Sequence, residues 1–150
     1  MSTQTPASIA LLGGGPIGLA TAILLARAGF APTVFDAREL AAAQGDRRLL
    51  ALSRGTLQVL RPLLGAQLPP MAPIIDVYVS SAGEFGTTHI GAQDVDDGRE
   101  PLGSTVFYAD LVTALAAAAA AEPGVRVQRP VRVGRVEQRS EGVTLHLAAA

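Results

Sequence analysis

Four glycines near the start of the chain, at positions 13, 14, 15 and 18, form the pattern with the clearest chemical meaning. The segment Gly13-Gly14-Gly15-Pro16-Ile17-Gly18 follows a short apolar run, residues 9–12, and precedes an apolar stretch of helical length, residues 19–28. A strand, a glycine-rich turn and a helix in this order form the first half of a dinucleotide-binding βαβ unit. The turn presents unpaired backbone N–H groups at the positive end of the helix, where a pyrophosphate can bind.

Three of these glycines have separate roles in such a unit, and an acidic residue completes it. Gly13 permits the tight turn, Gly15 lets the backbone approach a pyrophosphate, and Gly18 allows close packing of the helix on the strand. Asp36 follows a β-prone segment, residues 33–35, where a carboxylate is expected to accept a hydrogen bond from a ribose hydroxyl. The alternative is an ordinary tight turn with Asp36 as a solvated loop residue. Because strand, glycines, helix and acid agree, the sequence favours a site for an adenine dinucleotide.

The composition of the 150-residue chain fits one globular domain and removes several kinds of chemistry. Hydrophobic residues make up 49% and charged residues 17%, and the net charge of -1 gives no reason to expect nucleic acid. All twelve basic residues are arginine, which excludes a lysine Schiff base and a phosphate-loop lysine. The chain has no cysteine, and His89 and His146 have no metal-type spacing, so no metal site is expected. No nucleophile–base pair stands out, and no catalytic residue is assigned.

An apolar segment, residues 8–26, is long enough to suggest a membrane span or a secretory signal. No basic residue precedes Arg27, and the turn at residues 13–16 interrupts the segment in its middle. We therefore expect a soluble, cytoplasmic protein that could touch a membrane surface peripherally.

The glycine turn and Asp36 must be held by a fold in which strands and helices alternate. The expected class is α/β, with a Rossmann-like βαβ core, a hairpin insertion and an antiparallel β-meander. One helix is expected from the N-cap Ser53 through Leu64, and another from Asp110 through the alanines that follow. Strands are expected at residues 74–80 and 87–90, which form the hairpin, and at 125–127, 131–136 and 143–147. The acidic segment 94–98 lacks the later ligands of a calcium loop and is expected to be a solvated turn.

The strand near Val125 is expected to be the third parallel strand of the core, far along the chain from the second. This divides the chain into a nucleotide-binding core, about residues 1–48 and 102–150, and an insertion, about residues 49–101, with a helix and the hairpin.

Four stretches and the hairpin, which together extend over nearly the whole chain, have the pattern of a known family. The stretches are residues 13–20, 35–38, 46–53 and 102–111, and the hairpin runs from residue 77 to residue 86. They resemble the FAD-dependent aromatic hydroxylases related to para-hydroxybenzoate hydroxylase. The branch they resemble most is that of the ubiquinone-biosynthesis hydroxylases, of the 2-octaprenyl-6-methoxyphenol hydroxylase type. The glycine turn alone is unspecific, but together with Asp46-Arg47-Arg48-Leu49-Leu50-Ala51-Leu52-Ser53 and the hairpin it becomes fairly specific.

The resemblance implies that the bound dinucleotide is FAD. On the glycine turn the implied contacts are Gly13, Gly15, Pro16, Ile17 and Gly18. Asp36, Ala37 and Arg38 would lie at the adenosine ribose. Arg48 would lie near the phosphates or the ribityl chain, because its planar guanidinium suits an anionic pyrophosphate; Arg47 is the alternative to Arg48. The branch commonly has a polar residue that helps hold the flavin just before its Tyr-Ala-Asp-Leu-like segment, and here that position is Phe107.

The same resemblance implies a monooxygenase in which NAD(P)H reduces the flavin and O2 supplies the oxygen transferred to a phenol ring. The substrate would be a small aromatic molecule, a polyprenylated phenol on the route to ubiquinone, with peripheral association at the inner membrane or with a biosynthetic complex. Family members are longer, so we expect this chain to be an N-terminal part that binds FAD weakly and is inactive alone. Two alternatives remain: an NAD(P)-dependent dehydrogenase or reductase, in which Asp36 selects NAD, and a non-catalytic nucleotide-binding module.

Overall fold

A computed structural model describes residues 8–83, 85–96 and 98–148 of the chain. Its first sheet is parallel, in the order β1-β2-β8, and consists of β1 (Ser8–Leu12), β2 (Ala31–Phe35) and β8 (Arg126–Gln128). Leu12 and Gln128 both lie opposite Phe35, one on each side of β2. The three strands therefore end at one edge of the sheet, and the residues that follow them lie close together there.

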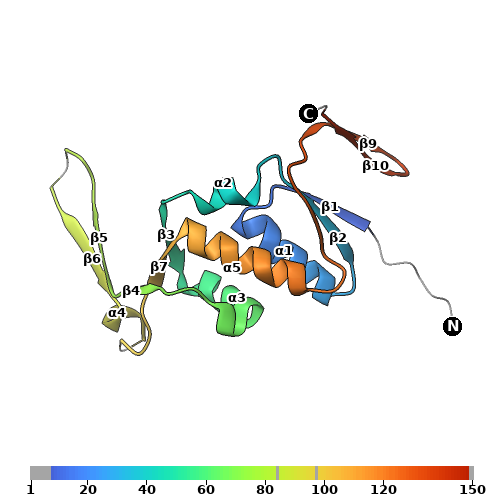
Figure 1. The fold of residues 1–150 in the computed structure, drawn as a ribbon. Coiled ribbons are helices and arrows are strands. Elements are labelled where there is room, and N and C mark those ends of the chain that lie inside the picture. The colour runs from blue at the N-terminus through green and yellow to red at the C-terminus, as the bar shows by residue number, and fades with distance from the viewer. Residues whose placement is uncertain (1–7, 84, 97, 149–150) are drawn as a thin grey trace.

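Two long helices pack side by side against this sheet (Figure 1). α1 (Pro16–Arg27) connects β1 to β2, and α5 (Tyr108–Ala121) leads into β8. Pro16 starts α1, where the missing N–H of proline removes no helical hydrogen bond. The buried residues of α5 recur every three or four positions, at Tyr108, Leu111, Leu115 and Ala119, so that one face of the helix enters the core.

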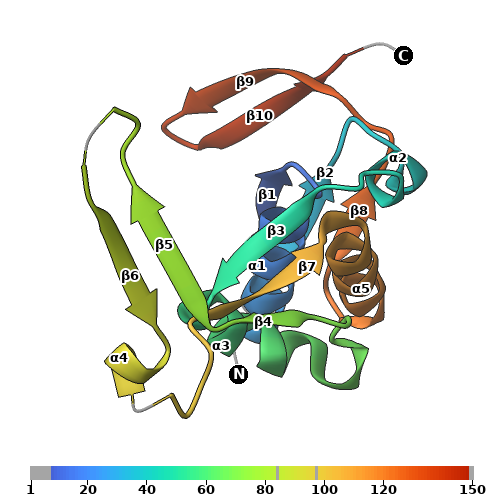
Figure 2. The same ribbon diagram turned by 90° about the vertical axis from the view of Figure 1, so that its left-hand side faces the viewer.

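A second sheet is antiparallel, in the order β3-β7-β4 (Figure 2). Its strands are β3 (Leu49–Ser53), β7 (Gly103–Phe107) and β4 (Ala72–Ile74). α3 (Arg54–Leu64) follows β3 and ends in the short 3-10 helix η1 (Gly65–Gln67), whereas α2 (Leu40–Gln44) packs against α5. The core lies among these helices and β7, and its buried side chains include Leu19, Ile23, Leu60, Leu63, Leu64, Val106, Tyr108, Leu111, Val112 and Leu115.

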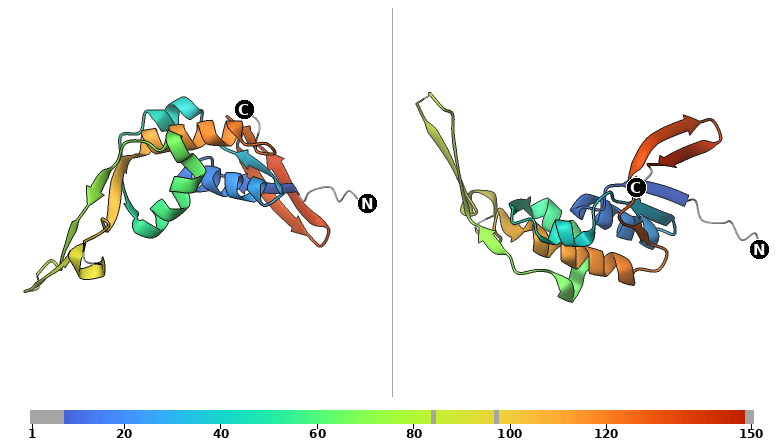
Figure 3. Two further views of the ribbon diagram at one scale, coloured as in Figure 1. Left: turned by 90° about the horizontal axis from the view of Figure 1, so that it is seen from below. Right: turned by 45° about the horizontal axis from the view of Figure 1, so that its top comes forward.

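Two hairpins extend from opposite ends of this body (Figures 1 and 3). One consists of β5 (Asp76–Ser80) and β6 (Thr87–Gly91), followed by the short helix α4 (Gln93–Asp96). The other consists of β9 (Val133–Arg139) and β10 (Gly142–Leu147). His89 lies on the first hairpin, where its Nε2 is 2.7 Å from Oδ1 of Asp76 and its ring stacks on Tyr78 at 4.5 Å. His89 is thus an exposed residue of this hairpin.

The α/β class, the Rossmann-like core and the third parallel strand are confirmed, but three local expectations need correction. The sequence does not predict β3 and β7, two strands that lie far apart in the chain and pair with each other. The strand expected at residues 74–80 is two strands, because β4 pairs with β7 and β5 pairs with β6. Within the acidic segment, Asp94 lies in α4 and its Oδ2 accepts a hydrogen bond from the Gly91 N–H at 2.7 Å. Asp97 of that segment lies outside the described residues.

Ser53 caps α3, as its place in the sequence predicts. Its Oγ accepts a hydrogen bond from the Thr56 N–H at 3.2 Å. We expect Ser53→Ala to lower the free energy of unfolding by about 1 kcal/mol, because one N–H of the first helical turn loses its acceptor. Urea unfolding measures this loss, and Ser81→Ala, in the exposed hairpin turn, is the matched control. Equal midpoints for the two variants would show that the cap contributes nothing.

Within the described part of the chain, no helix has the length and apolar character needed to cross a bilayer. Even α5 has only 14 residues.

Candidate dinucleotide site

The glycine turn lies where β1 ends, and it is tied to the end of β2. Gly13 has a φ of 109°, a left-handed backbone conformation that residues other than glycine rarely adopt. Its N–H donates a hydrogen bond to the Phe35 carbonyl oxygen at 2.8 Å. The turn is therefore held directly above the carboxyl end of β2, beside Asp36.

Gly15 and Gly18 lack side chains for different reasons. A Cβ on Gly18 would overlap the carbonyl oxygen of Gly13 and lie 3.1 Å from its carbonyl carbon, so α1 packs on the backbone of the turn. Gly15 has an unstrained φ of -78°, and the nearest atom to a Cβ placed there is the Tyr108 hydroxyl oxygen, at 3.4 Å. The protein itself has room for a side chain at Gly15. Gly15 is the N-cap of α1. The space in front of it is open to a ligand at the positive end of the helix.

Asp36 is buried beneath the turn, with 7% of its surface exposed, and is not a solvated loop residue. Its Oδ2 accepts a hydrogen bond from the Gly14 N–H at 2.8 Å, and its Oδ1 accepts one from the Arg38 N–H at 2.9 Å. Its backbone is also fixed, because the Asp36 N–H donates a hydrogen bond at 3.1 Å to the carbonyl oxygen of Gln128, the last residue of β8. The carboxylate is thus fixed at the edge of the sheet before any ligand binds.

Ala37 and Arg38 follow Asp36 on an exposed loop. The Arg38 side chain is 54% exposed, and its Nε lies 4.0 Å from Oδ1 of Asp36. A pair this exposed contributes little to stability. Arg38 is nevertheless placed where it could reach a ligand bound at the Asp36 carboxylate.

Arg48 precedes β3 and is held by two neighbours. Its Nη2 is 2.7 Å from Oδ2 of Asp46, and its guanidinium carbon lies 4.8 Å above the centre of the Tyr108 ring. The hydrogen bond from Arg48 lowers the pKa of the Asp46 carboxyl, and the same bond raises the pKa of the Arg48 guanidinium. The Tyr108 hydroxyl in turn faces Gly15, so Tyr108 links Arg48 to the glycine turn.

A cavity of about 580 Å³ opens beside this group, between α1, α3 and β3. Pro16 and Ile17 line it at the start of α1, Arg48 lines it just before β3, and Tyr108 lines it at the start of α5. Most of its remaining wall is apolar. Of the two arginines that the sequence leaves open, Arg48 is the one that borders this cavity.

The structure brings three further residues to the site that sequence reasoning did not assign. A Cβ on Gly14 would overlap the Arg129 guanidinium and lie 2.9 Å from Oδ2 of Asp36, so a side chain here would displace the groups of the site. Tyr108 lies in the matching segment 102–111, but the sequence assigns it no contact with the cofactor. Arg129 follows β8 directly, and its Nη2 donates to the Gly14 carbonyl oxygen. Its position after a parallel strand next to β2 is the signal that could have identified it.

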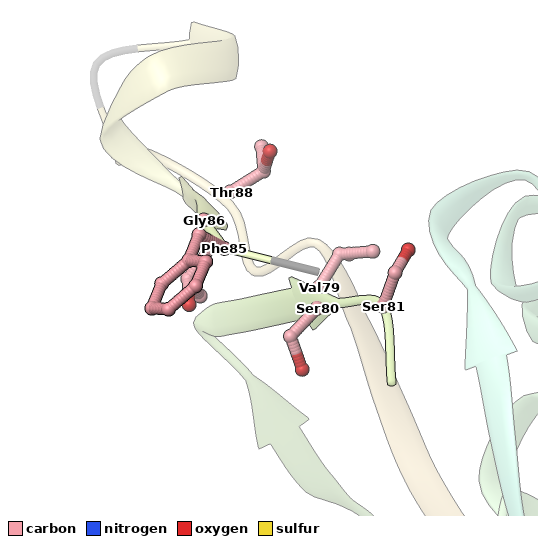
Figure 4. A pocket seen from close by; sticks show the side chains of 7 residues that line it. Val79, Ser80, Ser81, Phe85, Gly86 and Thr88 are labelled. Atoms are coloured by element: carbon pink, nitrogen blue, oxygen red, sulfur yellow. The ribbon is translucent and has the colours of Figure 1, made fainter. Parts of the chain in front are cut away.

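A separate hollow at the tip of the β5–β6 hairpin has a different character (Figure 4). Its volume is about 340 Å³, and it is lined by small polar and apolar residues: Val79, Ser80, Ser81, Phe85, Gly86, Thr87 and Thr88. The labelled side chains point in different directions in Figure 4, and none of the lining residues carries a charge. This hollow thus lacks the charged groups that suit an anionic dinucleotide, whereas the glycine turn has them nearby.

Comparisons with known proteins agree with this geometry. Residues 6–149 match a protein-family model described as an FAD binding domain. None of the curated protein sequences matches the chain.

Several solved structures share the fold. The Diels-Alderase PyrE3 of pyrroindomycin biosynthesis is 22% identical, with a TM-score of 0.74 over 93% of this chain and 29% of its own. The p-nitrophenol 4-monooxygenase PnpA from Pseudomonas putida DLL-E4 is 21% identical, with a TM-score of 0.70 over 97% of this chain and 36% of its own. The OxyS anhydrotetracycline hydroxylase from Streptomyces rimosus is 23% identical, with a TM-score of 0.69 over 95% of this chain and 28% of its own. This chain thus spans about a third of the length of these structures or less.

Proposed function

The chain belongs to the FAD binding domain family, and on this premise we propose that it binds FAD across its glycine turn as part of a flavin-dependent monooxygenase. The observation that carries the proposal is the turn itself. Its glycines leave the start of α1 open while the Gly14 N–H fixes the Asp36 carboxylate beside it. PnpA and OxyS, a monooxygenase and a hydroxylase, share this fold and support the reaction class.

The residues present fit the two ends of the cofactor. The open space at Gly15 suits a diphosphate, which would accept hydrogen bonds from backbone N–H groups at the start of α1. Asp36 would accept a hydrogen bond from a ribose hydroxyl, with Ala37 and Arg38 on the adjoining loop. Arg48, which lines the cavity together with Pro16 and Ile17, would reach the phosphates or the ribityl chain. Gly13 and Gly18 act indirectly, because they hold the turn and the helix together.

FAD, when bound, would supply the redox chemistry, with NAD(P)H as the reductant and O2 as the source of the transferred oxygen. The part of this chain is to bind and orient the cofactor and to keep water from one side of it. The apolar cavity beside Arg48 serves that second task. We further propose, from the sequence resemblance, that the substrate is an aromatic ring, a polyprenylated phenol of ubiquinone biosynthesis. Peripheral association with the inner membrane belongs to the same proposal.

A second candidate is an FAD-binding protein that does not hydroxylate. PyrE3 favours it, because its fold is similar and it is described as a Diels-Alderase. Absorbance spectra and turnover separate the candidates. For a monooxygenase, the intact protein should show flavin absorbance, release FAD on denaturation, and oxidise NAD(P)H faster when a phenol is added. Flavin absorbance without phenol-dependent oxidation would favour the second candidate, and binding of NADH without flavin would exclude both.

Gly15→Ala tests where the cofactor binds. Because the backbone at Gly15 is unstrained and a Cβ fits, we expect the free energy of unfolding to change by less than about 1 kcal/mol. The added methyl group would meet the diphosphate, so the Kd for FAD should rise about 100-fold. Flavin fluorescence titration measures the Kd. Gly45→Ala, at the end of α2 with φ -78° and no atom nearer than 3.7 Å to the added Cβ, should leave the Kd unchanged. Normal FAD binding by Gly15→Ala would place the cofactor elsewhere.

A further inference from the structure

Arg129 forms a buried ion pair with Asp36. β8 ends opposite Phe35, so Arg129 and Asp36 each follow the paired ends of neighbouring strands. Nη2 of Arg129 lies 3.6 Å from Oδ2 of Asp36, and both side chains are only 9% exposed. The same nitrogen donates a hydrogen bond to the Gly14 carbonyl oxygen. Nη2 of the guanidinium is therefore held by both the glycine turn and the Asp36 carboxylate.

The other nitrogens of this guanidinium have no acceptor in the described part of the chain. Nε and Nη1 of Arg129 are both buried and lack a hydrogen-bond partner there. Buried donors without partners are rare in folded proteins, so these two N–H groups require an explanation. A guanidinium cannot relieve the problem by losing its proton. An acceptor supplied by a ligand would satisfy these N–H groups.

The surroundings of Arg129 indicate what kind of acceptor this is. Arg129 borders a second cavity, of about 290 Å³, whose other lining residues are all aliphatic, among them Leu40, Ala119 and Val127. The positive charge of Arg129 is already balanced by Asp36, and a second anion would be repelled by that carboxylate. An uncharged acceptor on a flat apolar group suits this environment, and a ring nitrogen of a purine has both properties.

We propose that Arg129 is a specificity-determining residue for the adenine of the bound dinucleotide. Nη2 of Arg129 positions the Asp36 carboxylate, while Nε or Nη1 donates to a ring nitrogen of the base. This proposal rests on the proposed FAD site and adds a residue and a base contact to it. It also assigns a function to Gly14, whose missing side chain leaves room for the Arg129 guanidinium.

The test combines changes in the ligand with changes in the protein. The ligands are AMP and three AMP analogues in which N1, N3 or N7 of the base is replaced by carbon, and calorimetric titration of the intact protein measures their Kd values. We expect one analogue to bind the wild-type protein roughly 10- to 100-fold more weakly than AMP, because it lacks the acceptor for Arg129. The other two should bind like AMP.

Two variants then assign this preference to Arg129. Arg129→Lys keeps the charge beside Asp36 but loses the rigid fork of donors, and Arg129→Met removes both. Either variant should bind AMP and the sensitive analogue with equal Kd values. Relative to the wild-type protein, the Kd for FAD should rise by a factor similar to that for AMP. Arg126→Met, an exposed arginine on the same strand, should behave like the wild-type protein.

The outcomes separate this proposal from the proposed function. If the wild-type protein binds FAD but binds all three analogues as well as AMP, Arg129 does not read the base and the proposal is overturned. The proposal also fails if the preference for AMP persists in a folded Arg129 variant. If the wild-type protein binds neither FAD nor AMP, the proposed function itself fails. Because the analogue series uses the unaltered protein, it can overturn the proposal even where a variant does not fold.

Discussion

Gly18→Ala is expected to destabilise the protein by about 1 to 3 kcal/mol and to raise the Kd for FAD at least about 100-fold. The added Cβ would overlap the Gly13 carbonyl oxygen, which is backbone and cannot rotate away. Relief requires α1 to move away from the turn that Gly13 forms. Such a shift moves the N–H groups at the start of α1, on which a bound diphosphate depends. Urea unfolding and flavin fluorescence titration measure the two effects.

Gly55→Ala is the matched control for this prediction. Gly55 also lies in the first turn of a helix, α3, but a Cβ there would meet only the Ser53 Oγ, at 3.9 Å. Alanine has the higher helix propensity, so Gly55→Ala should leave stability unchanged or raise it by up to about 1 kcal/mol. If Gly18→Ala behaves like Gly55→Ala in both measurements, the close contact between α1 and the turn has no energetic importance.

Asp36→Ala is expected to lower the free energy of unfolding by about 3 to 5 kcal/mol and to abolish measurable FAD binding. Without its carboxylate, the Arg129 guanidinium is a buried charge that loses the counter-ion it has among the described residues, and the Gly14 N–H loses its acceptor. The ribose hydroxyl of a bound nucleotide loses its acceptor as well. Thermal and urea unfolding of the protein without ligand separate the loss of stability from the loss of binding.

A double variant tests the cause of that loss. Arg129→Met removes the charge that Asp36→Ala leaves unpaired, so Asp36→Ala with Arg129→Met should be more stable than Asp36→Ala alone. Asp76→Ala, which removes an exposed partner of His89, should cost less than about 1 kcal/mol. A double variant whose loss is the sum of the two single losses would show that the Asp36–Arg129 pair is not coupled.

The sequence allows prediction of the features that depend on residues close together in the chain. The turn at Gly13, the approach of Gly18 to it and Asp36 at the end of β2 all lie within one βαβ unit, whose pattern is local. The cap at Ser53 is local in the same sense, because it requires only the next three residues. Each of these expectations matches the structure.

The features that the sequence did not predict depend on distant pairing. β3 reads as an apolar segment of five residues, and only its pairing with β7 makes it a strand. Arg129 looks like one of several strand arginines, and it becomes a site residue only because β8 lies beside β2. Tyr108 likewise reaches Gly15 and Arg48 because α5 starts next to the glycine turn. A single sequence carries no record of which strands are neighbours.

The β5–β6 hairpin has a dynamic consequence. Its strands expose side chains on both faces, with Tyr78 69% and Val79 54% exposed, so little apolar surface is buried when the hairpin forms. A two-stranded ladder of this kind is only marginally stable by itself. Its amide protons should therefore exchange with deuterium far sooner than those around Leu19 and Ile23, which are fully buried. The β5–β6 hairpin would unfold and refold many times while the core around Leu19 and Ile23 stays folded.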